Sequence, residues 1–313
     1  MKKLEFKHIS VLLNESVDAL NIKENGIYAD GTLGGGGHSE KILERLSGSG
    51  LLIGIDQDAE AICAAKKRLE KFTNVIYENT NFKNIKDILI RNSIENIDGA
   101  VLDLGVSSYQ LDNADRGFSY IADSRLDMRM DLSSELDAYK VVNTYSEENL
   151  AKIFFEYGEE KFSRRIASQI VKARGEKPIE TTLELSELVK KCIPQKTVKK
   201  GSHPAKRVFQ AIRIEVNGEL AILEGALNDF FDVLKPGGHL AVISFHSLED
   251  RIVKNTFASL AKGCVCPKDF PVCVCGKKPR GKIITRKAVV PEDAEIEANK
   301  RSKSSKLRVI EKL

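Results

Sequence analysis

The fold is decided by the stretch Ile27-Tyr28-Ala29-Asp30-Gly31-Thr32-Leu33-Gly34-Gly35-Gly36-Gly37-His38. A short apolar run ends in an acid, a glycine-rich turn follows, and residues 39–46 carry the apolar spacing of a helix. Glycines let backbone N–H groups come close to a ligand, and the helix N-terminus adds the positive end of a dipole. A strand, a tight turn and a helix in this order predict a nucleotide-type site.

The alternation of strand and helix continues to about residue 104. Apolar runs at 51–55, 74–77 and 99–104 indicate further strands, and Asp58 is placed to cap a helix over 59–71. After a Lys-Pro-Gly-Gly turn at 235–238 the pattern resumes. It gives a strand at 239–245, a helix at 248–260 capped within 247–250, and an edge strand at 307–310. We therefore expect a mostly parallel sheet with helices on both faces.

Between these two parts the strand pattern is missing. Residues 105–131 are polar and loop-like, and helical patterns follow, among them a capping box of Thr181 with Glu184 and one long helical stretch over 206–231. We predict an α/β domain made of residues 1–111 and 218–313. An inserted helical domain of residues 112–217 would recognise the substrate.

Charge is distributed in a way that favours a polyanionic partner. The net charge is only +4, but residues 188–214 hold eight Lys or Arg and no acid. Residues 262–287 hold eight basic residues against Asp269, and 300–308 add five more. Solvated surface explains any one cluster, whereas three of them beside a nucleotide-type loop indicate RNA. No apolar run has the length of a membrane span or a signal peptide, so we expect a cytoplasmic protein without membrane contact.

The glycine loop departs from a dinucleotide site. Gly34 and Gly36 give G-x-G, but Ser39 stands where the third glycine belongs. Asp30 precedes the loop, and its carboxylate would repel a pyrophosphate. S-adenosylmethionine fits better, because it carries a sulfonium, an amino group and ribose hydroxyls but no phosphate. Asp56 follows Gly36 by twenty residues, where a carboxylate binds ribose hydroxyls. A purely structural strand-to-helix turn is the alternative.

A second motif, Asp103-Leu104-Gly105-Val106-Ser107-Ser108-Tyr109-Gln110, ends the fourth strand. Ligands in open α/β sheets bind outside these strand ends. A base amine is a poor nucleophile, so groups that accept its protons and hold it in line with a methyl donor would assist transfer. Asp103, Ser107 or a nearby backbone carbonyl could accept them. A simple polar cap at the strand exit is the alternative.

Two histidine-containing motifs have both a binding and a structural interpretation. His246 lies in Ser244-Phe245-His246-Ser247-Leu248-Glu249-Asp250-Arg251, where it could contact RNA, although a residue capping the helix is the slightly favoured role. His203-Pro204-Ala205-Lys206-Arg207, with Arg213 further along, could bind phosphates, or it could be solvated surface.

The six cysteines do not suggest a disulfide scaffold. Cys264-Val265-Cys266 and Cys273-Val274-Cys275 could hold zinc, yet structural zinc sites usually separate paired cysteines by two to four residues rather than one. Metal binding therefore stays open, and we assign no metal ligand. Cys63 and Cys192 are predicted to be buried thiols.

Several separated motifs together resemble a known family: residues 8–13, 30–32 with 36–38, 103–108, 127–131, 203–213 and 244–251. They are very similar to the bacterial small-subunit ribosomal RNA cytosine-N4 methyltransferases. The resemblance runs from about residue 8 to the last strand, and the four-cysteine loop is not part of it.

This resemblance implies a class I, Rossmann-like methyltransferase fold with an inserted helical domain. It also implies S-adenosylmethionine-dependent N4-methylation of one cytidine in the decoding region, with small-subunit ribosomal RNA as partner. The assembled subunit is the favoured acceptor, and free RNA stays open as the alternative. A homodimer is compatible with the sequence. The implied cofactor contacts are Gly36, Gly37, His38, Asp56, Phe82, Asp103 and Gln110. Val106-Ser107-Ser108 replaces the proline pair of DNA amino methyltransferases, so their proton-acceptor scheme does not transfer.

The predicted roles are therefore as follows. Asp103 and Ser107 are the candidate catalytic residues, and Lys206, Arg207, Arg213 and His246 are the candidate RNA-binding residues. Two other functions stay open: a nicotinamide-dependent oxidoreductase, which lacks an obvious hydride-transfer site here, and a non-catalytic RNA-binding or ribosome-assembly protein.

Overall fold

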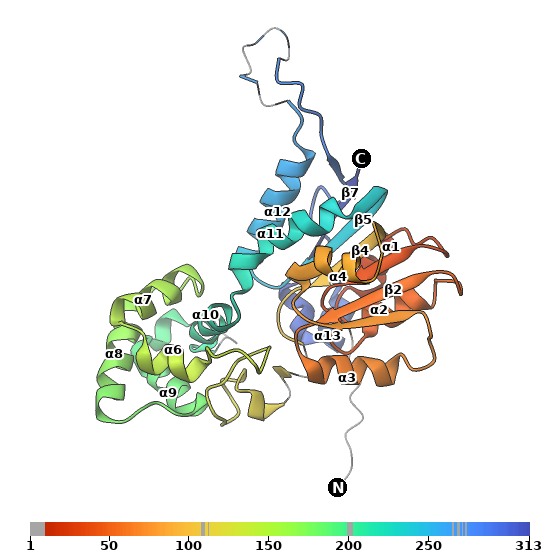
Figure 1. Cartoon of the computed structure of the whole chain (residues 1–313). Helices are drawn as coiled ribbons and strands as arrows, with labels where there is room; N and C mark the ends of the chain where they lie inside the picture. Colours follow the sequence, from red (N-terminus) through yellow and green to blue (C-terminus); the bar gives the residue numbers. More distant parts are fainter. Residues whose placement is uncertain are drawn as a thin grey trace. The chain divides into compact units, whose positions relative to one another are not determined.

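The computed structural model describes residues 10–107, 110–111, 113–198, 203–264, 266–267, 270, 272 and 274–313. The chain divides into two compact units (Figure 1). The first comprises Met1–Gly105 and Leu220–Leu313, and the second comprises Val106–Glu219. The predicted inserted domain, 112–217, falls inside the second unit. No helix in the described part of the chain combines the length and hydropathy that a bilayer crossing requires.

The first unit is built on a seven-stranded sheet of order β3-β2-β1-β4-β5-β7-β6. The first five strands are parallel, whereas β7 runs antiparallel to both β5 and β6. The strands are β1 (Ile27–Asp30), β2 (Leu51–Asp56), β3 (Val75–Asn79), β4 (Ile97–Asp103), β5 (Leu234–Ser244), β6 (Gly281–Ile283) and β7 (Lys306–Lys312). The mostly parallel sheet predicted from the sequence is confirmed. The strand order reverses between β1 and β4, which is where open α/β sheets bind ligands.

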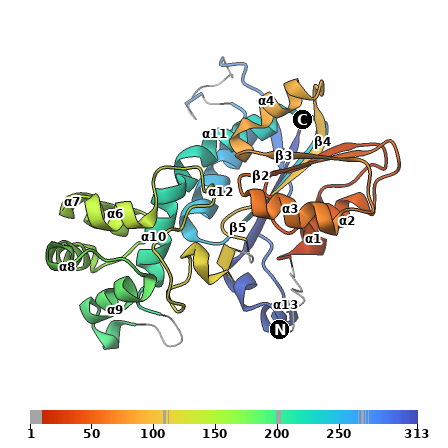
Figure 2. The same cartoon turned by 60° about the horizontal axis from the view of Figure 1, so that its bottom comes forward.

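Helices cover both faces of this sheet. Successive side chains of each strand point to opposite faces, and apolar side chains on both faces pack against helices. Tyr28, Leu52 and Val101 pack against α1, α2 and α3, while their neighbours Ala29 and Ile53 pack against α4, α11 and α12 (Figure 2). The helices are α1 (Leu13–Ala19), α2 (Gly37–Leu43), α3 (Ala59–Arg68), α4 (Ile85–Arg91), α11 (Glu219–Asp232), α12 (Ser247–Ala261) and α13 (Asp293–Ala298), with 3₁₀ turns η1 (Phe82–Asn84) and η4 (Lys300–Ser304).

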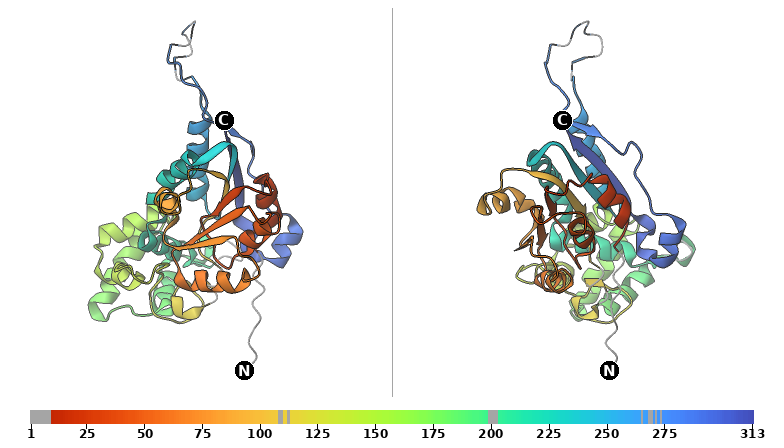
Figure 3. Two further views of the ribbon diagram at one scale, coloured as in Figure 1. Left: turned by 45° about the vertical axis from the view of Figure 1, so that its right-hand side comes forward. Right: turned by 90° about the vertical axis from the view of Figure 1, so that its right-hand side faces the viewer.

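The α13 helix lies beside α1 (Figure 3). There Glu295 accepts a hydrogen bond from the backbone N–H of Leu12 at 2.8 Å. This contact ties a segment late in the chain to the helix that precedes the glycine loop.

The second unit is helical and has a hydrophobic core of its own. Leu150, Phe154, Ile166, Leu185 and Ile212 are among its buried members. Its elements are η2 (Ala114–Arg116), α6 (Ala138–Thr144), α7 (Glu147–Glu156), α8 (Ser163–Glu176), α9 (Thr182–Cys192), η3 (Gln195–Thr197) and α10 (Lys206–Asn217). The predicted capping box at the start of α9 is confirmed.

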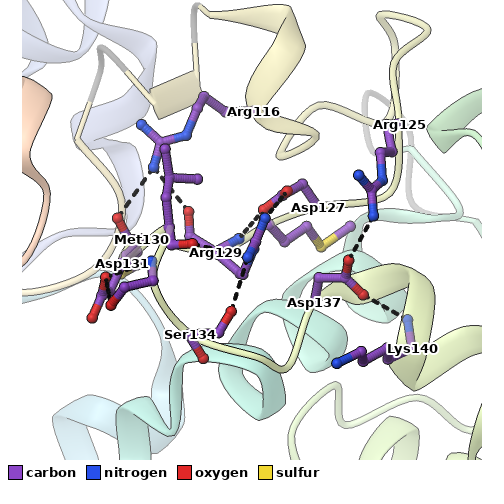
Figure 4. Close-up of polar contacts among 12 residues, drawn as sticks. Arg116, Arg125, Asp127, Arg129, Met130, Asp131, Ser134, Asp137 and Lys140 are labelled. Atoms are coloured by element: carbon purple, nitrogen blue, oxygen red, sulfur yellow. Dashed lines mark hydrogen bonds and ion pairs between the residues drawn. The ribbon is translucent and has the colours of Figure 1, made fainter.

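A polar network fixes the long loop ahead of α6 (Figure 4). Asp127 receives two hydrogen bonds from the guanidinium of Arg129, at 2.9 and 2.7 Å, and Arg116 donates to the carbonyls of Arg129 and Met130. Asn217, at the end of α10, donates to the carbonyl of Met128 and accepts from the N–H of Met130, both at 2.8 Å. The dense Asp-Met-Arg-Met-Asp run is therefore a structural brace within this unit.

Several details differ from the sequence prediction. The helical stretch over 206–231 is two helices, because Gly218 adopts a left-handed backbone with φ 60° that ends α10. The strand expected at the edge, β7, lies between β5 and β6, because the short β6 pairs outside it. Cys192 is buried as predicted, but Cys63 is exposed, because it lies on the side of α3 away from the inward-facing Ile62 and Ala65.

Candidate functional site

The glycine loop joins β1 to α2 in the first unit. Gly36, the residue before α2, has φ 76°, a left-handed conformation that favours glycine. A Cβ on Gly37 would lie 2.0 Å from the hydroxyl oxygen of Ser10, so a side chain at that position would force the neighbour away. The loop therefore stays close to its neighbours and presents backbone rather than side chains.

Asp30 ends β1 and is almost fully buried, with 1% exposure. Its carboxylate accepts hydrogen bonds from the hydroxyl of Ser39 at 2.7 Å and from the N–H of Thr32 at 3.1 Å. Burial raises its pKa to about 6, although both hydrogen bonds act in the opposite direction.

Asp56 ends β2 and holds the glycine loop in place. One carboxylate oxygen accepts the N–H of Gly34 at 2.8 Å, and the other accepts the N–H of Asp58 at 2.9 Å. Burial, and then the charges of Asp58 and Asp30, raise its pKa to about 6. The residue predicted to bind ribose thus also determines the shape of the loop.

Asp103 ends β4, on the other side of β1 from Asp56. Its pKa is raised well above the usual value by burial, followed by the charges of Asp30 and Glu249. Its Oδ1 is buried and accepts no hydrogen bond from any residue that the structure describes. His38 approaches its Oδ2 through Nδ1 at 3.9 Å, beyond hydrogen-bonding distance, while Nε2 of His38 contacts the carbonyl of Val11 at 3.1 Å.

These three acids share one physical property. They stand at the carboxyl ends of adjacent parallel strands, and within the described residues neutral donors hold Asp30 and Asp56, with no Lys or Arg paired to any of the three. Buried carboxylates without a counter-charge favour either a proton or a bound cation. This edge of the sheet is therefore suited to a positively charged ligand and unsuited to phosphate.

Phe82, predicted to contact the cofactor, begins η1 after β3 and is partly buried. A Cβ on Gly31 would lie 3.3 Å from the Cβ of Phe82 and 2.3 Å from a methyl carbon of Leu102. The glycine after Asp30 therefore lets this aromatic residue approach the loop.

Ser107 and Gln110 lie in the second unit and bond each other. The N–H of Ser107 donates to the Gln110 side-chain oxygen at 3.0 Å, and the N–H of Gln110 donates to the Ser107 hydroxyl at 3.2 Å. This reciprocal pair has the form of a capping box. It gives both residues a local structural role, and their predicted catalytic and cofactor-binding roles stay predictions.

His246 caps α12 in the first unit, the role that the sequence slightly favoured. Its side chain accepts the N–H of Glu249, and the Glu249 carboxylate accepts the N–H groups of Phe245 and His246. The cap is thus one residue earlier than the 247–250 segment predicted to supply it. Glu249, which sequence reasoning missed, is 2% exposed and adds negative charge toward Asp103. The only sign of Glu249 in the sequence was its position three residues after His246, which is the spacing of a capping box.

The other candidate RNA-binding residues lie on α10 in the second unit. Lys206 and Arg207 are exposed, although Arg207 donates to the carbonyl of Glu159 at 3.0 Å. Arg213 is mostly buried and makes two hydrogen bonds to Glu219, both at 2.8 Å. The ring of His203 stacks on Tyr120 with centroids 4.7 Å apart. The exposed cations are accordingly at the first turn of α10, and Arg213 is tied into an ion pair.

Comparison with known sequences identifies the family. Residues 5–313 match the MraW methylase family, which is nearly the whole chain. The chain belongs to the MraW methylase family. It is therefore an enzyme of the methyltransferase class.

Relatives and a solved structure are similar over nearly their full length. Ribosomal RNA small subunit methyltransferase H of Clostridium botulinum (strain Kyoto / Type A2) is 60% identical over 99% of this chain and 100% of that protein. The protein of the same name from Lachnospira eligens is 57% identical over 99% of each chain. A crystal structure of an rRNA methylase from Streptococcus thermophilus is similar with 13% identity and a TM-score of 0.44, covering 97% of this chain and 98% of that one.

The raised pKa of Asp103 predicts that the ligand-free protein is more stable when this side chain carries no charge. A carboxyl whose pKa is higher in the folded protein than in the unfolded chain destabilises the fold as the pH rises from the lower pKa to the higher one. A neutral Asn at this position should remove that destabilisation. We expect Asp103→Asn to raise the Tm of the ligand-free protein at pH 8 by about 2 °C or more, and the increment to vanish below about pH 4. Differential scanning calorimetry across pH measures both.

Asp98 on the same strand is the matched control. Although burial opposes it, hydrogen bonds from Lys235 and the N–H of Ile27 lower the pKa of Asp98. Asp98→Asn should therefore lower the Tm at pH 8. Equal Tm changes in both variants would contradict the assignment of uncompensated charge to Asp103.

Proposed function

We propose that this protein transfers a methyl group from S-adenosylmethionine to N4 of one cytidine in the decoding region of small-subunit ribosomal RNA. The observation that carries the cofactor is the set of carboxylates Asp30, Asp56 and Asp103, of which Asp30 is buried and the other two are partly buried. Membership of a methylase family supports the reaction class. The relatives named ribosomal RNA small subunit methyltransferase H support the substrate class, and the sequence motifs support the N4 position.

The residues at the sheet edge fit this cofactor. Bound there, it would supply a methyl group on a positively charged sulfur. Asp30 and Asp103 would compensate positive charge, and Asp103 has a buried oxygen left to accept a hydrogen bond. Asp56 would accept from ribose hydroxyls while it holds the N–H of Gly34. Gly36, Gly37 and His38 would bring backbone close to the ligand, Phe82 would lie on the adenine, and Gln110 would complete the contacts.

Asp103 would also serve as the proton acceptor. The cytosine amine loses a proton when the new N–C bond forms, and a carboxyl with a raised pKa accepts it more readily than an ordinary one. Ser107 would help to orient the amine, because its hydroxyl oxygen has a second lone pair that can accept an N–H of the amine beside the N–H of Gln110. Positioning and charge would then supply the rate enhancement.

The helical segment 112–217 would recognise the RNA, with the assembled small subunit rather than free RNA as acceptor. Exposed cations at the start of α10 suit phosphate, and His246 would contact RNA from the first unit. We place the reaction in the cytoplasm, and a homodimer stays compatible with it.

Cofactor affinity should depend on pH through the buried acids. A cationic cofactor binds best when the carboxylates are ionised. Protonation of Asp30 and Asp56, whose pKa values are about 6, should therefore weaken cofactor binding. We expect the Kd for S-adenosylmethionine, measured by isothermal titration, to rise about tenfold between pH 7 and pH 5. S-adenosylhomocysteine, which lacks the sulfonium charge, should change less. A pH-independent Kd, or binding of NAD instead, would argue for a different ligand.

Methyl transfer itself is tested with small subunits and a labelled methyl donor. We expect label in N4-methylcytidine at a single position after nuclease digestion, with subunits as better acceptors than free RNA. Asp103→Asn should reduce the rate by at least about a hundredfold. Absence of labelled cytidine with every acceptor would favour the non-catalytic RNA-binding alternative.

Charge reversal at Lys206 and Arg207 should weaken subunit binding without changing cofactor affinity. Each lost phosphate contact lowers the slope of log affinity against log salt by nearly one. The double variant to Glu should therefore bind about tenfold or more weakly at low salt and show a smaller slope. Lys152 and Lys161 on the same unit are the matched control pair, and a slope that is unchanged in the Lys206 and Arg207 variant would place the RNA surface elsewhere.

A further inference from the structure

Three cysteines gather in the segment between α12 and β6. The sulfur atoms of Cys264, Cys266 and Cys275 all lie within 4.8 Å of one another. Cys264 and Cys275 are separated by 3.8 Å between sulfurs, and the N–H of Cys266 points at the Cys264 sulfur at 3.4 Å. Cys273 lies outside the described residues.

The fold brings the two limbs of this segment together at its base. The N–H of Arg280 donates to the carbonyl of Leu260 at 3.0 Å, and a Cβ on Gly263 would lie 3.1 Å from the ring of Pro279. Cys264 continues one limb directly after Gly263. The meeting of Cys264 with Cys275 therefore extends a pairing that begins at the end of α12.

Hydrophobic packing does not account for this convergence. Residues 262–280 form neither helix nor strand where they are described, and the segment extends beyond the end of α12 (Figure 1). Phe270, Val272 and Val274 are 49%, 70% and 73% exposed. In the described residues of this segment, no hydrophobic core holds the two limbs together.

We propose that Cys264, Cys266 and Cys275 bind a zinc ion that clamps the two limbs. With Zn–S bonds of 2.3 Å, a tetrahedral site separates its sulfurs by about 3.8 Å, which matches the Cys264–Cys275 spacing. Thiolates are soft ligands that suit zinc. In a four-iron cluster each cysteine binds a different iron, and the sulfurs would stand further apart.

A backbone donor already faces the cluster. The N–H of Cys266 donates to the Cys264 sulfur, which would carry negative charge in a zinc site. The short C-x-C spacing argued against zinc in the sequence. In the structure it does not prevent a zinc site, because Cys264 and Cys266 come from one limb and Cys275 from the other. This site is independent of the methyl-transfer proposal.

Metal content tests the site directly. The full-length protein is expressed with added zinc, purified with a phosphine reductant and without chelators, and analysed by mass spectrometry for metals. We expect one zinc per chain, reduced to background in the Cys264→Ser/Cys275→Ser variant and unchanged in Cys63→Ser, which removes an exposed cysteine outside the cluster. Cobalt added to the chelator-treated protein should give the visible bands of a tetrahedral thiolate site.

A second readout does not depend on the variants. Trypsin cleavage after Lys277 should be at least several-fold faster in the chelator-treated protein, and added zinc should restore protection. The proposal is overturned by less than a tenth of an equivalent of zinc in the wild type, by equal zinc in the Cys264→Ser/Cys275→Ser variant, or by bound iron with sulfide. A Cys264–Cys275 disulfide that persists in the presence of the phosphine reductant also overturns it.

Discussion

The candidate site depends on one electrostatic constraint, namely that three carboxylates without a basic partner, one buried and two partly buried, lie close together where the parallel strands end. Asp30, Asp56 and Asp103 end β1, β2 and β4, and parallel pairing brings these ends to one edge. Neutral donors satisfy Asp30 and Asp56 without cancelling their charge, and the charge of Asp30 raises the pKa of both Asp56 and Asp103. Such an arrangement reduces the stability of the ligand-free protein, and a cationic ligand is what relieves it. Stability and function are therefore opposed at this edge.

The glycine loop cannot be separated from these acids. Asp56 holds the N–H of Gly34, and Ser39, just beyond the loop, donates to Asp30. The conformation of the loop and the environment of the carboxylates therefore depend on each other. Sequence reasoning treated the glycines as access for a ligand and the acids as its contacts. In the structure the acids also determine the path of the loop, so a substitution at either will affect both.

Local signals predicted the elements well, and longer-range features less so. Caps at Asp58 and Thr181 were readable because a side chain and an N–H two or three residues away suffice to make them. The break at Gly218 was missed because a glycine inside an apolar pattern is compatible with either a helix or a cap. The inner position of β7 could not be read from 307–310, since only pairing with the short β6 decides which strand is outermost. Arg213 looked like a free cation because its partner Glu219 lies beyond the end of α10.

By itself, the sequence determined the α/β alternation, the acidic strand ends around a glycine turn, the helical insertion and the family resemblance, because all of these depend on residue type and spacing along the chain. Only the tertiary structure decided that burial raises the pKa values of three acids, that Arg129 and Asn217 brace the loop before α6, and that cysteines from two limbs converge. Burial, charge coupling and convergence are relations between segments distant in sequence, and folding sets them by bringing those segments together.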